Sequence, residues 1–397
     1  MATSEPLRWM TCAPRDYPGD ERYFSRDTGL LCLGLREAGV ECQAILCGDP
    51  RPGDHPALIR ATPAELEQPA WWRQRGVGAV VIHTWSRREN TAILRAVREA
   101  GCRVILLQDG SGITGPLGRW WHWVRESWYL RHRQGRRGLA WFAARMLQGH
   151  TLRLLDFERE RAAQFELADL VLAPSPGAAE AYSVLAARYD RGRGAAKVQL
   201  LPHPVSSSFG SDGNPLKEDR IVAVGRWDDF WQKRPDLLGQ ALERCLERHP
   251  SWKAEIFGSP GSLEAWHQQL PASLQSRVLL AGQVANSQLA VAMARAKILL
   301  CSSAYESFHI ASAEALCSGA SVAGFDTPMA PSLRWFASEH SGTLSSRFDA
   351  VGLTDACDRE IAAWNAGQRN PANISRIWRA RLQAVEVARS LLAMAAR

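Results

Sequence analysis

The stretch from 298 to 324 constrains the fold more than any other, because it predicts a strand, a loop, a helix and a second strand in close succession. The apolar run Ile298–Cys301 has the length and composition of a buried parallel strand. A helical pattern follows over Phe308–Cys317, Gly319 ends it, and another strand begins at Ser321. The loop before the helix therefore opens at the C-terminal end of a parallel strand, where open α/β sheets bind ligands.

Two carboxylates mark this stretch, Glu306 in the loop and Glu314 eight residues later in the helix. That spacing is a little over two helical turns, so Glu314 can share a side of the helix with the loop. The free amides of the first helical turn suit a phosphate, and a carboxylate in the helix can accept hydrogen bonds from ribose hydroxyls. The alternative is that both glutamates are solvated on an ordinary surface helix.

The passage resembles the signature of retaining glycosyltransferases of the GT-B fold, the large family 4 in particular. In that signature seven residues separate two glutamates, and an alanine and a glycine precede the next strand. The matching residues here are Glu306, Glu314, Ala315 and Gly319. Where the family has Gly-Phe-Gly, this chain has Ser307-Phe308-His309. The resemblance implies that Glu306 contacts the donor sugar or its phosphate, that Glu314 holds the ribose, and that the amides near Ser307, Phe308 and His309 assist.

Two cations follow the predicted strand Arg220–Val224. Gly225 at the strand end permits close backbone approach, and Arg226 and Lys233 lie in the loop beyond it. Fixed cations stabilise the charge that grows on a departing nucleoside diphosphate, which makes both residues catalytic candidates. The alternative is two solvated surface cations. The family carries Gly-Arg and a later Lys here, so the resemblance implies a diphosphate site that needs no metal.

Further donor-side candidates follow two more predicted strands. Gly258 ends the strand Ala254–Phe257, and the resemblance implies that it lies near the nucleotide. Gln283 and Val284 follow the strand Val278–Leu280, at a position where relatives meet the nucleobase through backbone groups.

The first half of the chain alternates strands with helices, which predicts right-handed βαβ units and a parallel sheet. Polar residues follow three of its strands. They are His83, then Asp109 and Ser111, and finally Ser175. The resemblance implies that these strand ends handle the acceptor, with Asp109 also a catalytic candidate. Alternatively, His83 only caps its strand through a backbone hydrogen bond.

These observations predict two Rossmann-like domains that face a cleft, the GT-B arrangement. Residues 1–206 form the acceptor domain and residues 207–372 the donor domain. The segment 206–215 is rich in Ser, Gly, Asn and Pro and is the expected linker. A helix over 373–397 is expected to cross back to the first domain, as the resemblance implies.

The segment 119–147 combines seven arginines and five tryptophans with one acid, Glu126. Tryptophan favours the membrane–water interface and arginine binds lipid phosphates, so we expect contact with an anionic membrane surface. Two alternatives stay open: a groove for a polyanionic acceptor, and a solvated basic helix whose tryptophans pack on the domain.

Composition limits the remaining classes. The chain has 397 residues, a net charge of +7 and nine cysteines. The charge suits anionic ligands, and no nucleic-acid-binding signature accompanies it. The cysteines form no CxxC pair or Cys/His cluster and suit reduced thiols in a cytosolic protein. The start of the chain lacks an apolar signal sequence. We therefore expect a cytoplasmic protein, peripheral at the inner face of the membrane, with no cofactor and no bound metal.

The predicted function is transfer of a sugar, with retention, from a nucleotide-sugar to an acceptor hydroxyl on a glycan, lipid or small molecule. Two rivals remain. A histidine–acid pair and a water-activating site in the cleft would favour a nucleotide-sugar epimerase on the same fold. A non-catalytic protein that binds anionic lipid or glycan would depend on 119–147 instead.

Overall fold

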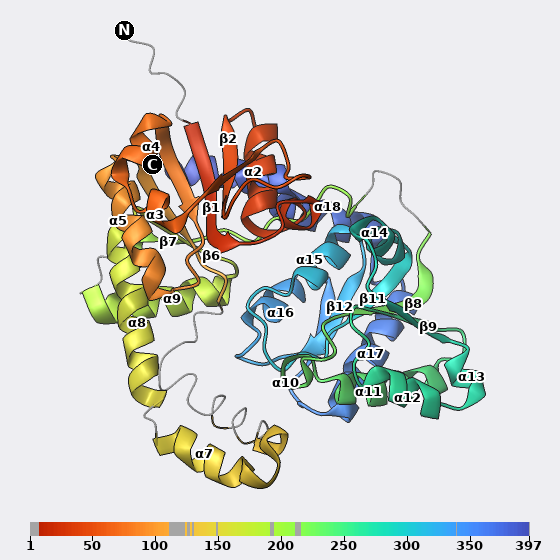
Figure 1. The fold of residues 1–397 in the computed structure, drawn as a ribbon. Coiled ribbons are helices and arrows are strands. Elements are labelled where there is room, and N and C mark those ends of the chain that lie inside the picture. The colour runs from red at the N-terminus through yellow and green to blue at the C-terminus, as the bar shows by residue number, and fades with distance from the viewer. Residues whose placement is uncertain are drawn as a thin grey trace. The chain divides into compact units, whose positions relative to one another are not determined.

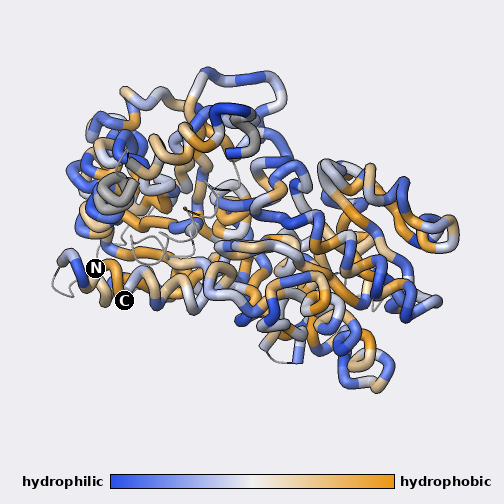
Figure 2. Tube along the Cα trace, turned by 90° about the horizontal axis from the view of Figure 1, so that it is seen from below, coloured by the Kyte–Doolittle hydropathy of each residue, from blue (hydrophilic) through white to orange (hydrophobic). Residues whose placement is uncertain are grey.

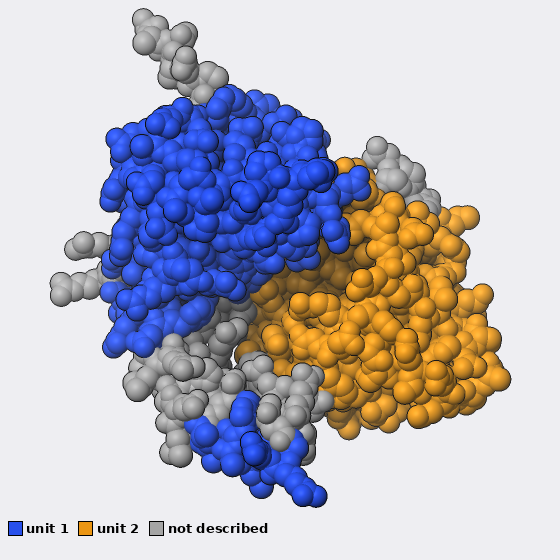
Figure 3. Space-filling view, in the orientation of Figure 1, with its two compact units in different colours: residues 1–201, 391–397 blue, residues 202–390 orange. Residues whose placement is uncertain are grey.

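The computed structural model describes residues 8–110, 124, 128, 131–147, 150–190, 194–210, 216–338 and 340–396, which form parts of two compact units (Figures 1 and 3). Unit 1 comprises residues 1–201 and 391–397, and unit 2 comprises residues 202–390. The division falls after Leu201, upstream of the boundary that composition suggests at residue 206. The last residues of the chain return to unit 1.

Unit 1 is built on a seven-stranded sheet with the order β3-β2-β1-β4-β5-β6-β7, in which the described pairs are parallel. Most residues of its inner strands are apolar and buried, as expected of strands covered on both faces. The strands are β1 Arg8–Asp16, β2 Cys42–Cys47, β3 Leu58–Ala61, β4 Val77–Ile82, β5 Arg103–Leu107, β6 Leu170–Ala173 and β7 Val198–Leu200.

Helices connect these strands and pack on the sheet through an apolar core that includes Trp72, Phe165 and Tyr182. The α-helices described in unit 1 are α1 Glu21–Phe24, α2 Asp27–Glu37, α3 Pro63–Leu66, α4 Pro69–Gln74, α5 Thr91–Glu99, α7 Gly138–Leu147, α8 His150–Leu167 and α9 Pro176–Asp190. Short 3-10 turns occur at η1 Arg88–Asn90, η2 Arg131–Arg137 and η3 Ala195–Lys197.

Unit 2 repeats the plan with a six-stranded parallel sheet, order β10-β9-β8-β11-β12-β13. Its strands are β8 Glu218–Val224, β9 Lys253–Phe257, β10 Val278–Gly282, β11 Ala296–Leu300, β12 Ser321–Phe325 and β13 Gly342–Ser345. Its helices are α10 Phe230–Lys233, α11 Pro235–Arg248, α12 Leu263–Gln269, α13 Ala272–Gln275, α14 Asn286–Arg295, α15 Ile310–Cys317, α16 Pro331–Phe336, α17 Ala350–Asn365, α18 Pro371–Leu382 and α19 Ala384–Ala395, of which the end of α19 belongs to unit 1.

Alternate strand residues of unit 2 enter separate cores on the two faces of its sheet. Ile298 and Leu300 pack with α11 and α17, whereas Leu299 packs with α14, α15 and α18. This alternation follows from the two-residue repeat of a strand. Hydrophobic segments accordingly run through the interior in Figure 2, with hydrophilic segments mostly outside them. The result is a helix–sheet–helix sandwich whose loops are free to carry chemistry.

The tail differs from the sequence prediction of a single helix. It forms two helices, α18 and α19, because Gln383 leaves the helical path and makes a β-bridge with Val205. The short elements β3, α3, α4, α12 and α13 were not predicted from the sequence.

The segment 119–147 lies partly outside the described residues. Within its described part, Trp128 is about half exposed and its ring lies 3.3 Å from the Arg131 guanidinium carbon. Helix α7 follows, with Leu139 exposed. Of the helices that the structure describes, none combines the length and apolar composition needed to cross a bilayer.

Candidate functional site

The candidate site lies where the strand order reverses in the sheet of unit 2. β8 has β9 on one side and β11 on the other, and the chain proceeds outward in both directions. Such a switch point leaves a crevice at the C-terminal ends of the two central strands, where α/β proteins bind ligands. The loop after β8 carries Lys233 and the loop after β11 carries Glu306, so the topology brings both residues to this edge.

Lys233 and Glu306 form a buried ion pair. The Lys233 ammonium donates to Glu306 Oε1 at 2.5 Å, although 73 positions separate the two residues. Lys233 is 8% exposed and Glu306 is 6% exposed. Each ion loses roughly several kcal/mol of hydration free energy when it is buried, so the two partners must satisfy one another. The fold thus places a fixed positive and a fixed negative charge side by side at the sheet edge.

The ionisation of Glu306 depends on this pairing. Burial by itself would raise the pKa of the carboxyl, but the charges of His309 and Lys233 outweigh it and lower the pKa below its ordinary value. Burial lowers the pKa of His309 to about 4, so this imidazole is neutral at pH 7. Lys233 is therefore the cation that keeps Glu306 ionised at neutral pH.

Three hydrogen bonds join the two loops into one body. Ser302 Oγ donates to the carbonyl of Lys233 at 2.6 Å, and the amide of Ala304 donates to the carbonyl of Gln232 at 2.7 Å. Gln232 Nε2 donates to the carbonyl of Tyr305 at 3.1 Å. The position of Lys233 is therefore set by the β11–α15 loop as well as by its own helix.

Arg226 provides an accessible cation at the same edge. Its side chain is 75% exposed, and Nη2 lies 3.8 Å from Asp229 Oδ2 and donates to Gln232 Oε1 at 3.3 Å. Exposed ion pairs of this kind are weak, so the guanidinium can exchange these partners for a phosphate that it binds through two donors. Gln232 links Arg226 to the loop that carries Glu306.

His309 occupies the position just before α15 with a left-handed backbone, φ 56°. A glycine adopts this conformation without strain, whereas a histidine does so at a cost. The ring is enclosed: Nδ1 lies 2.6 Å from Ser312 Oγ, and Nε2 lies 3.6 Å from Cys301 Sγ and 4.0 Å from Glu306 Oε1. Where the signature described above has a glycine, this chain therefore places an imidazole beside the Lys233–Glu306 ion pair.

The other candidates on this loop and helix divide into backbone and side-chain roles. The Phe308 side chain is 1% exposed and packs edge-on against Phe336 and His203, so only its backbone can meet a ligand. Ser307 is half-buried. Glu314 is buried within α15, and its charge adds to burial in raising the pKa of Cys317.

Glycines hold the strand ends of unit 2 close together. Gly258 has φ 104°, and a Cβ there would lie 1.8 Å from the Gly225 carbonyl oxygen. The amide of Gly258 donates to the carbonyl of Gly282 at 2.8 Å. Beyond this point Gln283 is exposed and Val284 is half-buried against the core. The close approach explains the glycine at 258 independently of any ligand.

Unit 1 has its own switch point between β1 and β4. Trp85, after β4, lies 4.2 Å from the buried His83 ring. Arg15 lies near the end of β1, and its guanidinium is 5.2 Å from the Trp85 ring and 4.9 Å from the Tyr17 ring. This edge is therefore lined by rings and one guanidinium, a surface suited to the apolar face of a sugar or another ring.

The remaining candidate residues of unit 1 lie in different environments. Asp109 is exposed. The charge of Asp27 raises the pKa of Arg26 most, and the charge of Asp109 adds a smaller effect in the same direction. Ser175 is fully buried and its hydroxyl accepts from the amide of Ala178 at the start of α9, which accounts for it structurally. Ser111 lies outside the described residues.

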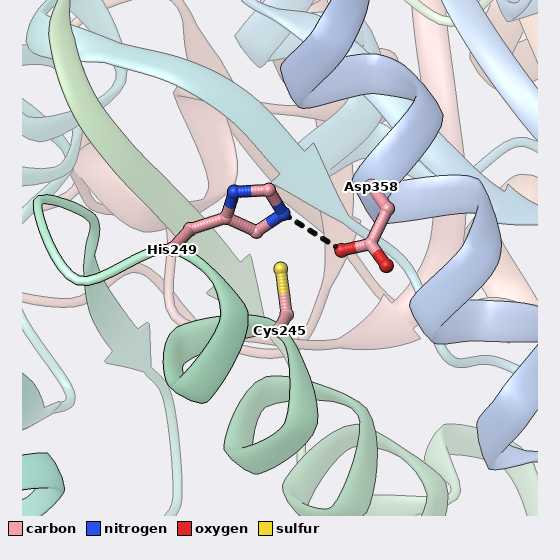
Figure 4. A group of neighbouring side chains, drawn as sticks. All are labelled: Cys245, His249 and Asp358. Carbon is pink, nitrogen blue, oxygen red and sulfur yellow. Dashed lines mark hydrogen bonds and ion pairs between the residues drawn. The ribbon is translucent and has the colours of Figure 1, made fainter.

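One cluster was missed by sequence analysis, and the prediction of no Cys/His cluster is wrong. Cys245 on α11 and His249, the C-terminal cap of that helix, meet Asp358 on α17, with one donor atom from each residue within 4.8 Å of the others (Figure 4). The Cys-x3-His spacing on one helix was the available signal, because residues four apart share a helix face.

Comparison with known proteins identifies unit 2. Residues 218–361 match the family described as Glycosyl transferases group 1. This match covers 144 of the 397 residues, so the likeness to the family lies within unit 2. The match covers both Lys233 and Glu306. The predicted resemblance to glycosyltransferases is therefore confirmed for this region.

A curated relative agrees with this identification. The phosphatidylinositol N-acetylglucosaminyltransferase gpi3 subunit of Schizosaccharomyces pombe is 27% identical over 174 residues, 42% of this chain and 38% of that protein. The match thus spans well under half of the relative.

Structural likeness extends further. Anabaena Alr3699/HepE, solved with UDP, has a TM-score of 0.65 at 15% identity, covering 98% of this chain and all of that chain (100%). The lipopolysaccharide outer core galactosyltransferase WaaB has a TM-score of 0.61 at 15% identity, covering 98% and 99%. A candidate UDP-N-acetylglucosamine 2-epimerase from Listeria monocytogenes has a TM-score of 0.55 at 12% identity, covering 98% and 95%. These likenesses confirm the predicted GT-B fold class of two Rossmann-like domains.

Proposed function

We propose that this protein is a retaining, metal-independent glycosyltransferase that moves a sugar from a nucleotide-sugar to an acceptor hydroxyl. The observation that carries the proposal is the buried Lys233–Glu306 pair, 2.5 Å apart, at the switch point of a glycosyl transferases group 1 domain. Exposed Arg226 at the same edge supports it.

Each residue has a proposed role in this reaction. Arg226 and Lys233 bind the diphosphate, since an ammonium has three N–H donors and can serve phosphate oxygens beside Glu306. As the glycosidic bond breaks, negative charge grows on the leaving phosphate, and these preplaced cations stabilise it without reorganisation. The leaving phosphate then accepts the proton of the acceptor hydroxyl on the same face of the sugar.

The proposal assigns the remaining donor contacts as follows. Glu306 holds Lys233 in place and contacts the donor sugar or its phosphate. Glu314 accepts hydrogen bonds from the ribose, the backbone near Ser307 and His309 contacts the phosphate, and the nucleobase lies by Gln283 and Val284.

The donor and acceptor follow as narrower proposals. The relative from Schizosaccharomyces pombe is named for transfer of N-acetylglucosamine to phosphatidylinositol, and HepE was solved with UDP. UDP-sugars, with UDP-N-acetylglucosamine first, are therefore the donors to test. On the acceptor side we assign Trp85, His83 and Asp109 of unit 1.

The test is release of nucleoside diphosphate from a panel of nucleotide-sugars in the presence of lipid and glycan acceptor extracts. Lys233→Ala removes a charge that acts in the transition state, so kcat/KM should fall about 100- to 1000-fold. Glu306→Gln should lower it comparably. Lys253→Ala is the matched control, because Lys253 is an exposed lysine at the start of β9. Equal activity in Lys233→Ala and Lys253→Ala would refute the assignment.

An epimerase is the second candidate, because His309 Nε2 lies 4.0 Å from Glu306 Oε1 and supplies the histidine–acid pair that this activity requires. The same panel run in D2O distinguishes the two. A transferase releases nucleoside diphosphate only with an acceptor, whereas an epimerase interconverts two nucleotide-sugars and incorporates deuterium at carbon.

Contact with anionic membranes through 119–147 is a separate proposal. Exposed Trp128 and its stacked Arg131 support it. Sedimentation with phosphatidylglycerol vesicles should exceed that with phosphatidylcholine vesicles, and Arg136→Glu with Arg137→Glu should abolish the difference. Unchanged sedimentation in this variant would count against membrane contact and favour a purely structural role.

A further inference from the structure

A second cluster of reactive side chains lies between α11 and α17, at the C-terminal end of α11. Cys245 and His249 are four positions apart on α11 and its C-terminal cap, so they share one helix face. Cys357 and Asp358 are adjacent on α17, which packs against α11 in the same core. In Figure 4 the side chains of Cys245, His249 and Asp358 point toward one another.

The distances suit a small metal ion. His249 Nε2 lies 3.0 Å from Asp358 Oδ1, and the donor atoms of Cys245, His249 and Asp358 all lie within 4.8 Å of one another. Tetrahedral zinc, with bonds of about 2.0–2.3 Å, holds its ligand atoms roughly 3.3–3.8 Å apart. Shifts of about 1 Å, within the range of side-chain rotation, would convert the cluster into a site of that geometry.

Burial and second contacts prepare the cluster for this role. The Cys245 side chain is fully buried, while those of His249 and Asp358 are 27% and 24% exposed, so an ion can reach the cluster from solvent. Arg248 donates to Asp358 Oδ2 and so fixes the carboxylate with its other oxygen toward His249. Metal ligands are commonly oriented by such outer contacts.

We propose that Cys245, His249 and Asp358 bind a zinc-type divalent ion, with solvent as the fourth ligand. On binding, the Cys245 thiol loses its proton to solvent and a sulfur–metal bond forms. Sulfur and imidazole ligands favour Zn²⁺ over Mg²⁺ or Ca²⁺, which prefer oxygen. The ion would cross-link α11 to α17 and stabilise unit 2.

This site is separate from the proposed catalysis. Lys233 precedes α11, whereas the metal cluster is at its C-terminal end. The 14 residues of α11 span about 21 Å. The inference is therefore independent of the proposed function and compatible with metal-independent transfer.

The experiment uses the full-length protein, purified with reductant, stripped with a chelator and dialysed. Titration with ZnCl₂ against a chromophoric chelator should give one ion per chain, and a saturating ion should raise Tm by at least ~3 °C. Titration with Co²⁺ should give a sulfur-to-cobalt absorption band in the near ultraviolet, which reports the thiolate ligand directly.

Variants assign the ligands. His249→Gln and Asp358→Asn change partly exposed side chains, so the fold should survive, and each should weaken zinc binding at least tenfold. Cys245→Ser should abolish the cobalt band. Cys102→Ser, which alters a buried thiol in unit 1, is the matched control and should leave both readouts unchanged.

Three results would overturn the proposal. The first is a folded wild-type protein that takes up no zinc at 100-fold excess over protein. The second is zinc binding that survives both Cys245→Ser and His249→Gln. The third arises from Cys357, whose Sγ lies 3.3 Å from Cys245 Sγ. A Cys245–Cys357 disulfide that forms in air, with no zinc uptake after reduction, would assign the cluster to thiol chemistry instead.

Discussion

The two switch points of this chain share a topology and differ in chemistry. In each unit the first strand in the chain lies inside the sheet, and the strand order continues outward from it on both sides. Both folds therefore open a crevice beside that strand. In unit 2 this edge holds a buried ion pair, Lys233 with Glu306. In unit 1 it holds the rings of His83 and Trp85 with the Arg15 guanidinium.

This contrast indicates that the fold sets where a ligand binds, whereas the loops set which ligand binds. A charged pair held at fixed distance suits a diphosphate, whose charge changes during reaction. An aromatic edge suits a ligand recognised by its apolar face and hydroxyls. Four comparisons between variants test this contrast, and they follow in order of decreasing expected effect.

The ion pair should separate stability from function. Lys233→Ala leaves Glu306 buried without its cation and should cost about 3–5 kcal/mol of unfolding free energy. The double variant Lys233→Met with Glu306→Leu removes both charges and should recover most of that loss while remaining inactive. Urea unfolding of the three proteins gives the comparison. A double variant as unstable as the single one would mean that the pair stabilises the fold outright.

The glycine at 258 should be far less replaceable than a glycine of similar backbone in unit 1. Gly258→Ala adds left-handed strain and an overlap with the Gly225 carbonyl, together about 2–5 kcal/mol. Gly39 has φ 88° but no atom within 4 Å of the position that a Cβ would take, so Gly39→Ala adds strain alone, about 1–2 kcal/mol. Thermal unfolding compares them. Equal shifts in Tm would show that the strand ends can move apart.

His309 should make stability depend on pH. Its pKa is lowered to about 4, while an unfolded histidine titrates near 6.5, so the unfolded state binds more protons between these values. The unfolding free energy should therefore be highest above pH 6.5 and fall as the pH drops toward 4, by up to about 3 kcal/mol. Denaturant titrations at pH 7.5 and 5 measure the loss.

His309→Asn provides the control for that effect, since asparagine tolerates a left-handed backbone and does not titrate. The variant should lose much of the slope between pH 7.5 and 5. An unchanged slope would place the titrating group elsewhere.

The aromatic edge of unit 1 should affect the acceptor alone. Trp85→Ala removes the ring that Arg15 covers and should raise the acceptor KM about tenfold, equivalent to ~1.4 kcal/mol, with donor binding unchanged. Initial rates at varied acceptor and donor concentrations separate the two. A rise in donor KM with an unchanged acceptor KM would reverse the assignment of the two units.

Sequence patterns predicted the fold well where the signal is local. The alternation of apolar strands and helices from Arg220 to Phe325 follows from side-chain periodicity, and the structure has these elements within a few residues. The break at Gln383 was missed because it depends on a bridge to Val205, a contact far away in the chain. Short helices such as α12 and α13 carry too few repeats to be recognised.

Sequence motifs selected two residues that the structure brings together, but they did not predict the contact between them. Lys233 and Glu306 were both chosen from their motifs, but their direct pairing depends on the adjacency of β8 and β11. The role of Gln232 in joining the two loops has no sequence signal. The cluster on α11 and α17 was missed because Asp358 lies 109 positions from His249 and enters only through helix packing.

The hydrogen bonds that join Gln232 and Lys233 to residues 302–305 have a practical consequence for engineering. A chimaera that imports only one of these loops from another protein would leave backbone donors and acceptors of the other loop unmatched at the edge of the sheet. Transplants intended to change what this edge binds should therefore exchange 225–234 and 301–309 as a single cassette.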